Sequence, residues 1–206
     1  MLGSRKSWVS LPPNRRAVFT AADRDAAWIF LPLVGSFLAH LPVIRYDLLR
    51  SLKRPVDGGA TFRGRRVFGD NKSWRGMLAM SSGVLVATLI LSSRTWYWSK
   101  IPAEIHDAGP LAFGALLGIG TVLAELPGSF VKRQLDIAPG AQRRSFAGTL
   151  ISIWDQGDFV PGVFVALLPI YRMTLPQIIW SFAVVAGLHL AISVVGFALG
   201  ARKTIL

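Results

Sequence analysis

The chain has 206 residues, of which 52% are hydrophobic and only 17% are charged, and its formal net charge is +12. Soluble domains carry about 25% charged residues, so this composition argues against a soluble globular protein. A strongly basic protein binds nucleic acid, anionic lipid or phosphorylated ligands, and nucleic acid is the least favoured here because the bases lie in short loops between apolar blocks. Cysteine is absent, which excludes disulfides, zinc–thiolate sites and thiol nucleophiles.

The N-terminal residues 1–26 form a polar and basic arm. No signal peptide is expected there, because the first apolar block begins late and lacks a small-residue cleavage site behind it. The remaining chain, 27–206, is expected to form one transmembrane domain. A helix needs about 20 apolar residues to cross the hydrocarbon core of a bilayer. The sequence therefore predicts an all-α integral membrane protein, a bundle of about five transmembrane helices at 27–44, 77–93, 109–126, 150–171 and 176–201.

Lysine and arginine residues indicate how this bundle is oriented. Two basic loops, 45–76 and 127–146, fall on the same side of a five-helix bundle as the tail residues Arg202 and Lys203. Bases are enriched in cytoplasmic loops, so this side is expected to face the cytoplasm. The predicted location is the cell membrane.

The first candidate site is the basic, glycine-rich segment 63–76 in the first of these loops. Glycine and Asn71 permit positive φ, which lets backbone amides fold around an anion. Ser73 is expected to cap a helix that begins near Trp74, and a helix N-terminus favours negative charge. Phosphate binding is predicted on this basis, with four cations available: Arg65, Arg66, Lys72 and Arg75. The alternative is an ordinary positive-inside loop with Trp74 as a headgroup anchor.

Carboxylates mark two further candidate sites. Glu125 ends an otherwise uncharged block, where a carboxylate needs a partner or a metal; the alternative is that it lies in headgroup water and pairs with Lys132 or Arg133. Asp155 and Asp158 interrupt the fourth block, and their spacing would place them on one face if the segment is helical. Paired acids in apolar surroundings favour a shared cation, and Mg²⁺ binds one or two carboxylates together with phosphates and water. The alternative is a water-exposed break between two half-helices.

Other chemistries find little support in the sequence. His40 and His189 lie inside apolar blocks and His106 lies in a short turn, so packing roles are favoured for all three. The run Asp57-Gly58-Gly59-Ala60 is similar to the start of the CDP-alcohol phosphotransferase motif, but the arginine and the later aspartates of that motif are missing.

Together the three clusters resemble the CDP-archaeol synthase family, relatives of the CDP-diacylglycerol synthases. Gly64–Gly76 is similar to the family's first motif, which begins Gly-Arg-Arg and ends Trp-x-Gly. Ser129–Arg133 is similar to its Ser-Phe-Val-Lys-Arg core, and Asp155–Phe159 to its Asp-Gln-x-Asp-Phe motif. The combination is specific, whereas each motif alone is not.

The resemblance implies a cytidylyltransferase that moves CMP from CTP to a membrane lipid phosphate, giving a CDP-lipid and pyrophosphate, with Mg²⁺ as cofactor. The residues it implies as catalytic are Lys72, Arg75, Lys132, Arg133, Asp155 and Asp158. Nucleotide binding is expected at Arg65, Arg66, Asn71, Lys72, Ser73, Ser129 and Lys132. Metal binding is expected at Asp155, Asp158 and, as a weaker candidate, Glu125. The competing hypothesis is a small transporter or lipid-binding scaffold without enzymatic activity, and a homo-oligomer is left open.

Overall fold

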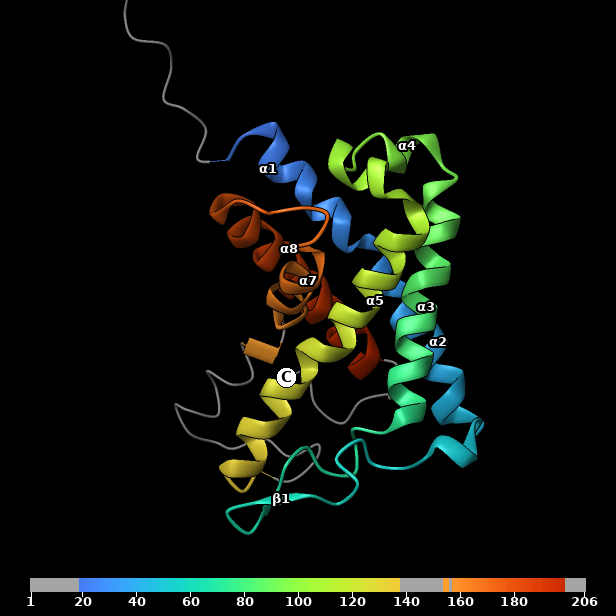
Figure 1. Cartoon of the computed structure of the whole chain (residues 1–206), viewed down its shortest axis with the longest axis vertical. Helices are drawn as coiled ribbons and strands as arrows, with labels where there is room; N and C mark the ends of the chain where they lie inside the picture. Colours follow the sequence, from blue (N-terminus) through green and yellow to red (C-terminus); the bar gives the residue numbers. More distant parts are fainter. Residues whose placement is uncertain (1–18, 138–153, 156, 199–206) are drawn as a thin grey trace, which may run out of the picture.

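The structure, a computed structural model, describes residues 19–137, 154–155 and 157–198. This part of the chain consists of helices, most of them joined by short connections, and a small hairpin lies in the longer connection 46–73 (Figure 1). Three helical runs in it are long and apolar enough to cross a membrane: Ala21–Arg45, Trp74–Ser92 and Ala103–Gln134. The prediction of an all-α integral membrane bundle is therefore confirmed.

The first run is longer than the predicted span at 27–44. It consists, without a break, of α1 (Ala21–Asp25), η1 (Ala26–Leu33) and α2 (Val34–Arg45). Thr20 caps its start, because the Thr20 hydroxyl accepts a 3.1 Å hydrogen bond from the Asp23 amide, while the Asp23 carboxylate accepts one of 2.8 Å from the Thr20 amide. Pro32 lies inside η1 and has no amide hydrogen to donate, which favours a departure from regular α-helix there.

Two long helices follow, α3 (Trp74–Ser92) and α5 (Ala103–Gln134), with the short α4 (Thr95–Trp98) between them. Gly109 interrupts α5 near its start, with φ 80° and ψ 161°, so the regular helix begins close to the predicted position. At its other end α5 continues through Pro127 to Gln134, well beyond the predicted end at residue 126. As a result Lys132 and Arg133 lie on a helix and not in a loop.

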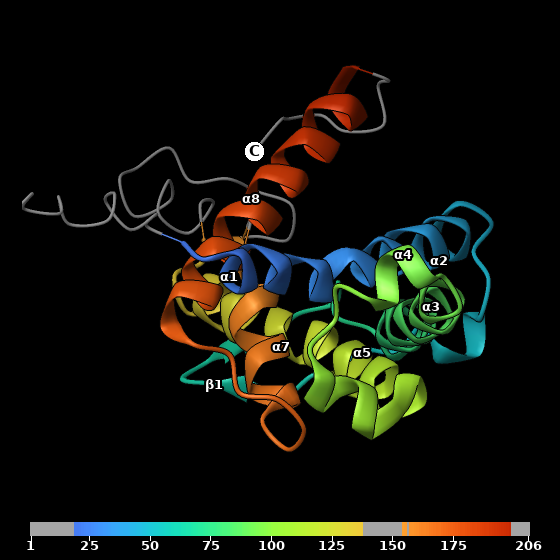
Figure 2. The ribbon, with the colours of Figure 1, turned by 90° about the horizontal axis from the view of Figure 1, so that it is seen from above.

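The last described helices are α7 (Phe159–Leu167) and α8 (Leu175–Ala198). They correspond to the predicted spans 150–171 and 176–201, of which residues 150–153, 156 and 199–201 lie outside the described part. With 9 residues α7 is too short to cross the hydrocarbon core by itself, whereas α8 has 24 residues. Figure 2 shows α3 nearly end-on but α8 along its length, so α8 is strongly inclined to α3.

Small residues bring the long helices together. α3 packs between α2 and α5, and α5 packs in turn against α7 (Figure 1). Gly35 of α2 and Gly83 of α3 lie backbone to backbone, since a Cβ at Gly35 would stand 2.2 Å from the Gly83 carbonyl oxygen. A Cβ at Gly118 of α5 would stand 2.7 Å from the carbonyl oxygen of Ser81. Such close approach is the usual role of small residues between membrane helices.

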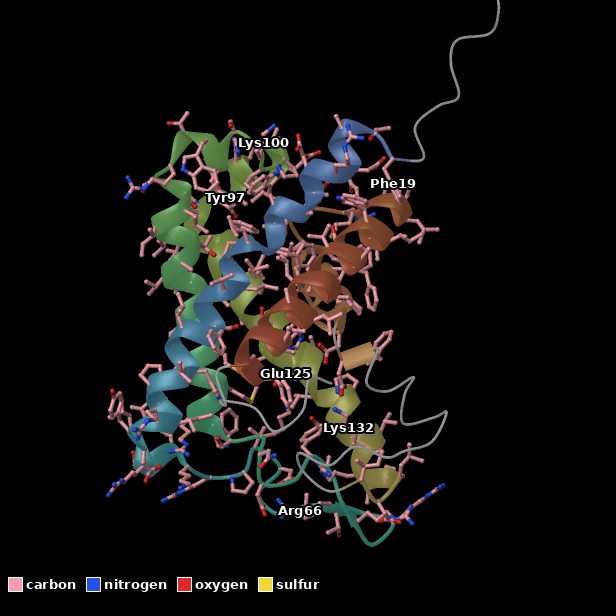
Figure 3. All side chains as sticks on the ribbon, turned by 180° about the vertical axis from the view of Figure 1, so that it is seen from behind. Phe19, Arg66, Tyr97, Lys100, Glu125 and Lys132 are labelled. Carbon is pink, nitrogen blue, oxygen red and sulfur yellow. The ribbon has the colours of Figure 1, made fainter. Side chains whose placement is uncertain are left out.

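Charged groups gather at one end of the bundle. This end holds the N-terminus of α3, the last turns of α5, η2 (Arg50–Leu52) and the antiparallel hairpin of β1 (Thr61–Phe62) and β2 (Arg65–Arg66). Figure 3 shows Arg66, Glu125 and Lys132 toward this end and Tyr97 and Lys100 at the opposite end. The described parts of the two basic loops thus share one end, as expected from the sequence. That this end faces the cytoplasm stays a prediction.

Candidate active site

Two ion pairs connect the three sequence clusters. The ammonium group of Lys72, just before α3, pairs with the Glu125 carboxylate on α5. The ammonium group of Lys132, about two turns further along α5, pairs with Asp155. The four side chains are between 21% and 28% exposed, so each pair is partly shielded from water. Clusters that are far apart in the sequence therefore meet in one site.

Asp158 is the most deeply buried acid of this site. It is 7% exposed, and its Oδ1 atom has no hydrogen-bond partner among the described residues. Gly128 of α5 leaves room beside both aspartates, since a Cβ built there would lie 3.5 Å from Asp155 Oδ1 and 3.9 Å from Asp158 Oδ2. The other charged groups that face Asp158 are Glu125, Lys72 and Lys132. A buried carboxylate oxygen without a partner costs free energy, and this indicates that the site receives a ligand.

The two aspartates fit the requirements of Mg²⁺. Within the described ranges, no group of three or more His, Asp or Glu side chains is arranged to hold a metal ion. Mg²⁺ does not need such a cage, because it keeps several waters and is held by one or two carboxylates together with substrate phosphates. The unpartnered Asp158 oxygen, and the side-chain-free surface of Gly128 beside both aspartates, are compatible with this mode of binding. The expected third ligand, Glu125, is paired with Lys72.

The segment that was expected to bind phosphate is a fixed loop leading into α3. Ser73 caps the helix, as predicted, and its hydroxyl accepts a 3.4 Å hydrogen bond from the Gly76 amide. The Val56 amide donates to the Lys72 carbonyl oxygen at 2.8 Å, which ties the loop to the strand-like stretch before the hairpin. Lys72 is therefore held at the positive end of the α3 dipole, where an anion is favoured.

Glycine geometry in this segment agrees in part with the prediction. Gly64 and Gly69 adopt φ of 78° and 84°, whereas Asn71 does not adopt positive φ. Gly69 also packs against Arg133, because a Cβ at Gly69 would lie 2.9 Å from Arg133 Nε. The same Nε donates a 3.2 Å hydrogen bond to the Phe68 carbonyl oxygen. Arg133 therefore anchors the loop to the end of α5.

Asp57 is a residue of this region whose role the sequence did not reveal. Its side chain is 1% exposed and accepts hydrogen bonds from Arg66 Nη2 (2.7 Å) and from the amides of Phe68 (2.9 Å) and Gly69 (3.0 Å). Burial raises the pKa of Asp57, but these bonds outweigh it and hold the pKa well below its usual range. The available signal was an acid followed by Gly58 and Gly59, and the sequence analysis interpreted this run as an incomplete CDP-alcohol phosphotransferase motif.

The arginines of the hairpin mainly hold the hairpin itself. Arg66 pairs with Asp57 at 2.7 Å and with Asp70 at 2.8 Å. Arg65 pairs with Asp136 at 2.6 Å, just beyond the end of α5. Their predicted part in nucleotide binding stays a prediction, and in this structure both guanidinium groups already have carboxylate partners.

The side chains of two other predicted site residues, Arg75 and Ser129, bond to groups other than the carboxylates of Glu125, Asp155 and Asp158. Arg75 donates a 2.6 Å hydrogen bond to Asp47, and this bond lowers the pKa of Asp47. Ser129 is 8% exposed and donates at 2.9 Å to the Glu125 carbonyl oxygen of its own helix. The residues that the structure does bring together are Lys72, Lys132, Glu125, Asp155 and Asp158.

A cavity of about 420 Å³ opens beside this group. Its walls are mostly apolar side chains from η1, α2, α3, α5 and α8, among them Phe30, Phe37, Met77, Val122 and Leu188. Its polar lining consists of Ser36, His40, Asn71, Lys72, Ser73, Glu125 and His189. The cavity therefore joins an apolar compartment between helices to the charged end of the bundle, which suits a molecule with an apolar chain and an anionic head.

Fold and site together define a class of protein: an integral membrane protein with paired lysines and carboxylates at one end of a helical bundle, next to an apolar cavity. The family model described as CarS-like, CDP-archaeol synthase, matches residues 35–205. The CDP-archaeol synthase of Thermococcus kodakarensis is 30% identical over 174 residues, which are 84% of this chain and 92% of that protein. The CDP-archaeol synthase of Methanoculleus marisnigri is 35% identical over 159 residues, 72% of this chain and 87% of that protein.

A solved structure is similar as well. It is described as "Structural insight into an intramembrane enzyme for archaeal membrane lipids biosynthesis", and it matches with a TM-score of 0.57 and 26% identity over 82% of this chain and 92% of that one. The chain belongs to the CDP-archaeol synthase family, a family of CTP-dependent lipid cytidylyltransferases. It is an integral membrane enzyme of the cytidylyltransferase type, in agreement with the resemblance seen in its sequence.

Proposed function

We propose that this enzyme transfers the cytidylyl group of CTP to a membrane lipid phosphate and releases pyrophosphate. The observation that carries the proposal is the meeting of Asp155 and Asp158 with Lys72 and Lys132, of which Lys72 also lines an apolar cavity together with Glu125. Acids that suit Mg²⁺, cations that suit phosphates and a cavity that suits a lipid are what the two substrates require. A transporter or a scaffold is not favoured by the family to which the chain belongs.

The reaction needs alignment and charge neutralisation more than acid–base chemistry. An oxygen of the lipid phosphate attacks the α-phosphorus of CTP, and the bond from this phosphorus to the oxygen that bridges the α- and β-phosphates breaks. The product is a CDP-lipid, and pyrophosphate leaves with the bridging oxygen. A phosphate monoester is already anionic near neutral pH, so the nucleophile requires no Ser, Cys or His base.

Lys72 and Lys132 would supply the fixed positive charge. Each ammonium group is held near the acids by one carboxylate, and substrate phosphates would become additional or replacement partners. Positively charged groups held in a partly dry site stabilise charge that develops on a departing pyrophosphate. The N-terminus of α3 adds backbone amides and a favourable dipole on the same side.

Asp155 and Asp158 would hold Mg²⁺, with Glu125 as a weaker candidate. When bound, the metal neutralises phosphate charge and orients the phosphate oxygens. A bound cation would also account for the burial of Asp158 beside Asp155. Two close carboxylates in apolar surroundings repel each other unless a cation lies between them.

The lipid substrate is proposed to be a phosphate with archaeal ether-linked chains, because the relatives are CDP-archaeol synthases. Its apolar chains would lie in the cavity and against the bundle, and its head would reach Lys72. The site is proposed to face the cytoplasm of the cell membrane, since most bases beside the spans are at this end. CTP and the lipid phosphate are the partners, and nucleic acid is not expected.

The test is a turnover assay with purified protein in detergent or vesicles. Radiolabelled CTP is offered with ether and diacyl lipid phosphates, with and without Mg²⁺, and both pyrophosphate and labelled lipid are measured. We expect both products in equal amounts, dependence on Mg²⁺ and preference for the ether lipid. Absence of pyrophosphate with every lipid phosphate would contradict the proposal, and release of CMP from a CDP-lipid and an alcohol would indicate a phosphotransferase.

A further inference from the structure

Asp155 and Asp158 belong to a short segment that lies between two helices. The described residues of this aspartate segment are Trp154, Asp155, Gly157 and Asp158. Its carboxylates face α5, where a Cβ at Gly128 would lie 3.5 Å from Asp155 Oδ1 and 3.9 Å from Asp158 Oδ2. Its backbone faces α8 at Gly157, which is buried and stands between the two acids in the chain. The segment is therefore held between α5 and α8, with its acids toward α5.

The contact with α8 is made by the ring of Phe182. A Cβ built at Gly157 would stand 2.5 Å from Phe182 Cε2 and 2.7 Å from its Cδ2 and Cζ atoms, so the edge of the ring rests directly on the glycine backbone. Any side chain at position 157 would have to displace either the ring or the segment. The ring of Trp154 lies at 6.4 Å from that of Phe182, measured between centroids. Phe182 thus contacts the aspartate segment at two points.

The ring of Phe182 is itself held in place. It is partly buried and packs against the hydrophobic core of the bundle. The helix that carries it, α8, packs against η1 and α7, and Val185 one turn further along α8 is buried. Closely packed side chains have low compressibility and transmit a displacement to their neighbours. The ring is therefore suited to fix the position of the backbone that it touches.

We propose that Phe182 is a positioning residue for the reaction: its ring supports the backbone at Gly157 and holds Asp155 and Asp158 toward α5, in the geometry in which they bind the divalent cation. This inference rests on the proposed cytidylyl transfer and on the assignment of the two aspartates to Mg²⁺. Phe182 has no polar side-chain atom, so its effect on the cation is exerted through the position of the aspartate segment alone.

The sequence did not single out this pair of residues. Phe182 is one apolar residue among many in the predicted span 176–201. The motif that Asp155–Phe159 resembles, Asp-Gln-x-Asp-Phe, leaves position 157 open. Only the structure shows that glycine at this position is what allows the ring to approach.

The test uses the fit between the glycine and the ring. Gly157→Ala places a methyl group where the ring lies, and Phe182→Ala removes the ring. Loss of groups that orient metal ligands weakens metal binding by about 10–100-fold, so each variant should bind the cation about tenfold more weakly than the parent. The double variant should bind it more tightly than Gly157→Ala alone, because the methyl group then meets no ring. Phe182→Leu, which keeps apolar bulk, should lie between the parent and Phe182→Ala.

Cation binding is measured without turnover. Mn²⁺ stands in for Mg²⁺, and its uptake by the purified full-length protein is followed by electron paramagnetic resonance with CTP and without lipid phosphate. CTP without protein is the blank. In a separate turnover assay kcat should fall in both single variants while the lipid KM stays near its parental value, since Phe182 is not among the described residues that line the cavity.

Two control variants separate this role from packing in general. A Cβ at Gly120 of α5 would be crowded as well, at 2.8 Å from Ala166 Cβ, but Gly120 lies about two turns before Gly128. Gly120→Ala is expected to lower the melting temperature and to keep the parental Mn²⁺ affinity. Phe197→Ala removes an exposed ring of the same helix α8 and should also bind Mn²⁺ as the parent does.

Parental Mn²⁺ affinity in folded Phe182→Ala would overturn the inference, and so would a double variant that binds Mn²⁺ no better than Gly157→Ala. If Gly157→Ala does not fold, Phe182→Ala and Phe182→Leu decide by themselves, and parental affinity in both overturns the inference. A parent protein that takes up no Mn²⁺ would refute the metal assignment of the proposed function. That result is distinct from a parent that binds Mn²⁺ and variants that bind it equally well.

Discussion

One oxygen of the Asp57 carboxylate accepts a 2.7 Å hydrogen bond from Arg66, and the other accepts hydrogen bonds from the amides of Phe68 and Gly69. One side chain, 1% exposed, thereby closes the hairpin and fixes the start of the loop that presents Lys72. Arg133 reaches the same loop from α5 through the Phe68 carbonyl oxygen. The geometry of the segment that leads into α3 thus depends on a buried acid outside the group of Lys72, Lys132, Glu125, Asp155 and Asp158.

Asp57→Asn should therefore destabilise the protein and lower turnover together. The amide removes the negative charge and one acceptor, and loss of bonds of this kind costs about 1–3 kcal/mol. Thermal unfolding in detergent measures the first effect and the CTP assay the second. Asp70→Asn is the matched control, because Asp70 also pairs with Arg66 but its side chain is 76% exposed, and it should change neither quantity measurably.

The stabilisation by Asp57 should depend on pH with a defined sign. The hydrogen bonds hold the pKa of folded Asp57 below that of the unfolded chain, which is about 3.9. Its contribution is therefore complete above that value and is lost as the pH falls toward the folded pKa. The difference in melting temperature between parent and Asp57→Asn should be constant from pH 7 to 5 and shrink from pH 4 to 3. A difference that grows toward acid would contradict this.

Lys72→Ala should reduce kcat/KM for CTP and lipid phosphate by a factor that corresponds to about 2–3 kcal/mol, as other lost groups that stabilise a developing negative charge do. The fold should be retained, since Lys72 contributes a side chain to the site and its backbone bonds are unchanged. Glu125→Gln, measured by the same kcat/KM, would test the contribution of the carboxylate that pairs with Lys72. Near-parental activity of Lys72→Ala would remove Lys72 from the site.

Arg75 offers an instructive contrast with Lys72. Both were expected to hold phosphates, but Arg75 bonds to Asp47 and is 12% exposed in its side chain. We expect Arg75→Ala and Asp47→Asn to lower the melting temperature in the same direction and to affect kcat less than Lys72→Ala does. A double variant that is no less stable than either single variant would show that the two act through one contact. If Arg75→Ala is folded yet as inactive as Lys72→Ala, the sequence expectation for Arg75 is right.

Gly128→Ala tests the space between the two aspartates. A Cβ there fits, at 3.5 Å from Asp155 and 3.9 Å from Asp158, and alanine is the better helix former, so the protein should remain folded. The methyl group would nevertheless crowd a cation held by the two carboxylates. We expect the Mg²⁺ concentration for half-maximal activity to rise by about tenfold, the lower limit for changes around metal ligands. Gly187→Ala, which has nothing within 4 Å, should leave it unchanged.

Apolar length predicted the membrane bundle, and the family resemblance implied that residues of all three clusters act in one site. The sequence placed the end of the third span at 126, because Pro127 and the charges after it resemble a loop, but α5 continues to Gln134 and carries Lys132 toward Asp155. Charge type alone also could not show that Lys72 and Arg75 have different partners. The partner of Arg75 depends on where Asp47 lies after the turn that ends α2. Asp57 was missed because its partners other than Arg66 are backbone amides, which no sequence pattern displays.

Turnover of Asp158→Asn compared with the parent protein is the most direct test of the proposed site. The substitution keeps the size of the side chain and removes the charge of a carboxylate whose Oδ1 atom has no hydrogen-bond partner in the described residues. With CTP, ether lipid phosphate and Mg²⁺, we expect pyrophosphate release to fall by at least about a thousandfold while thermal stability is kept or increased. A folded Asp158→Asn protein that releases pyrophosphate at the parental rate, with the same dependence on Mg²⁺, would contradict the assignment of this aspartate pair to the reaction.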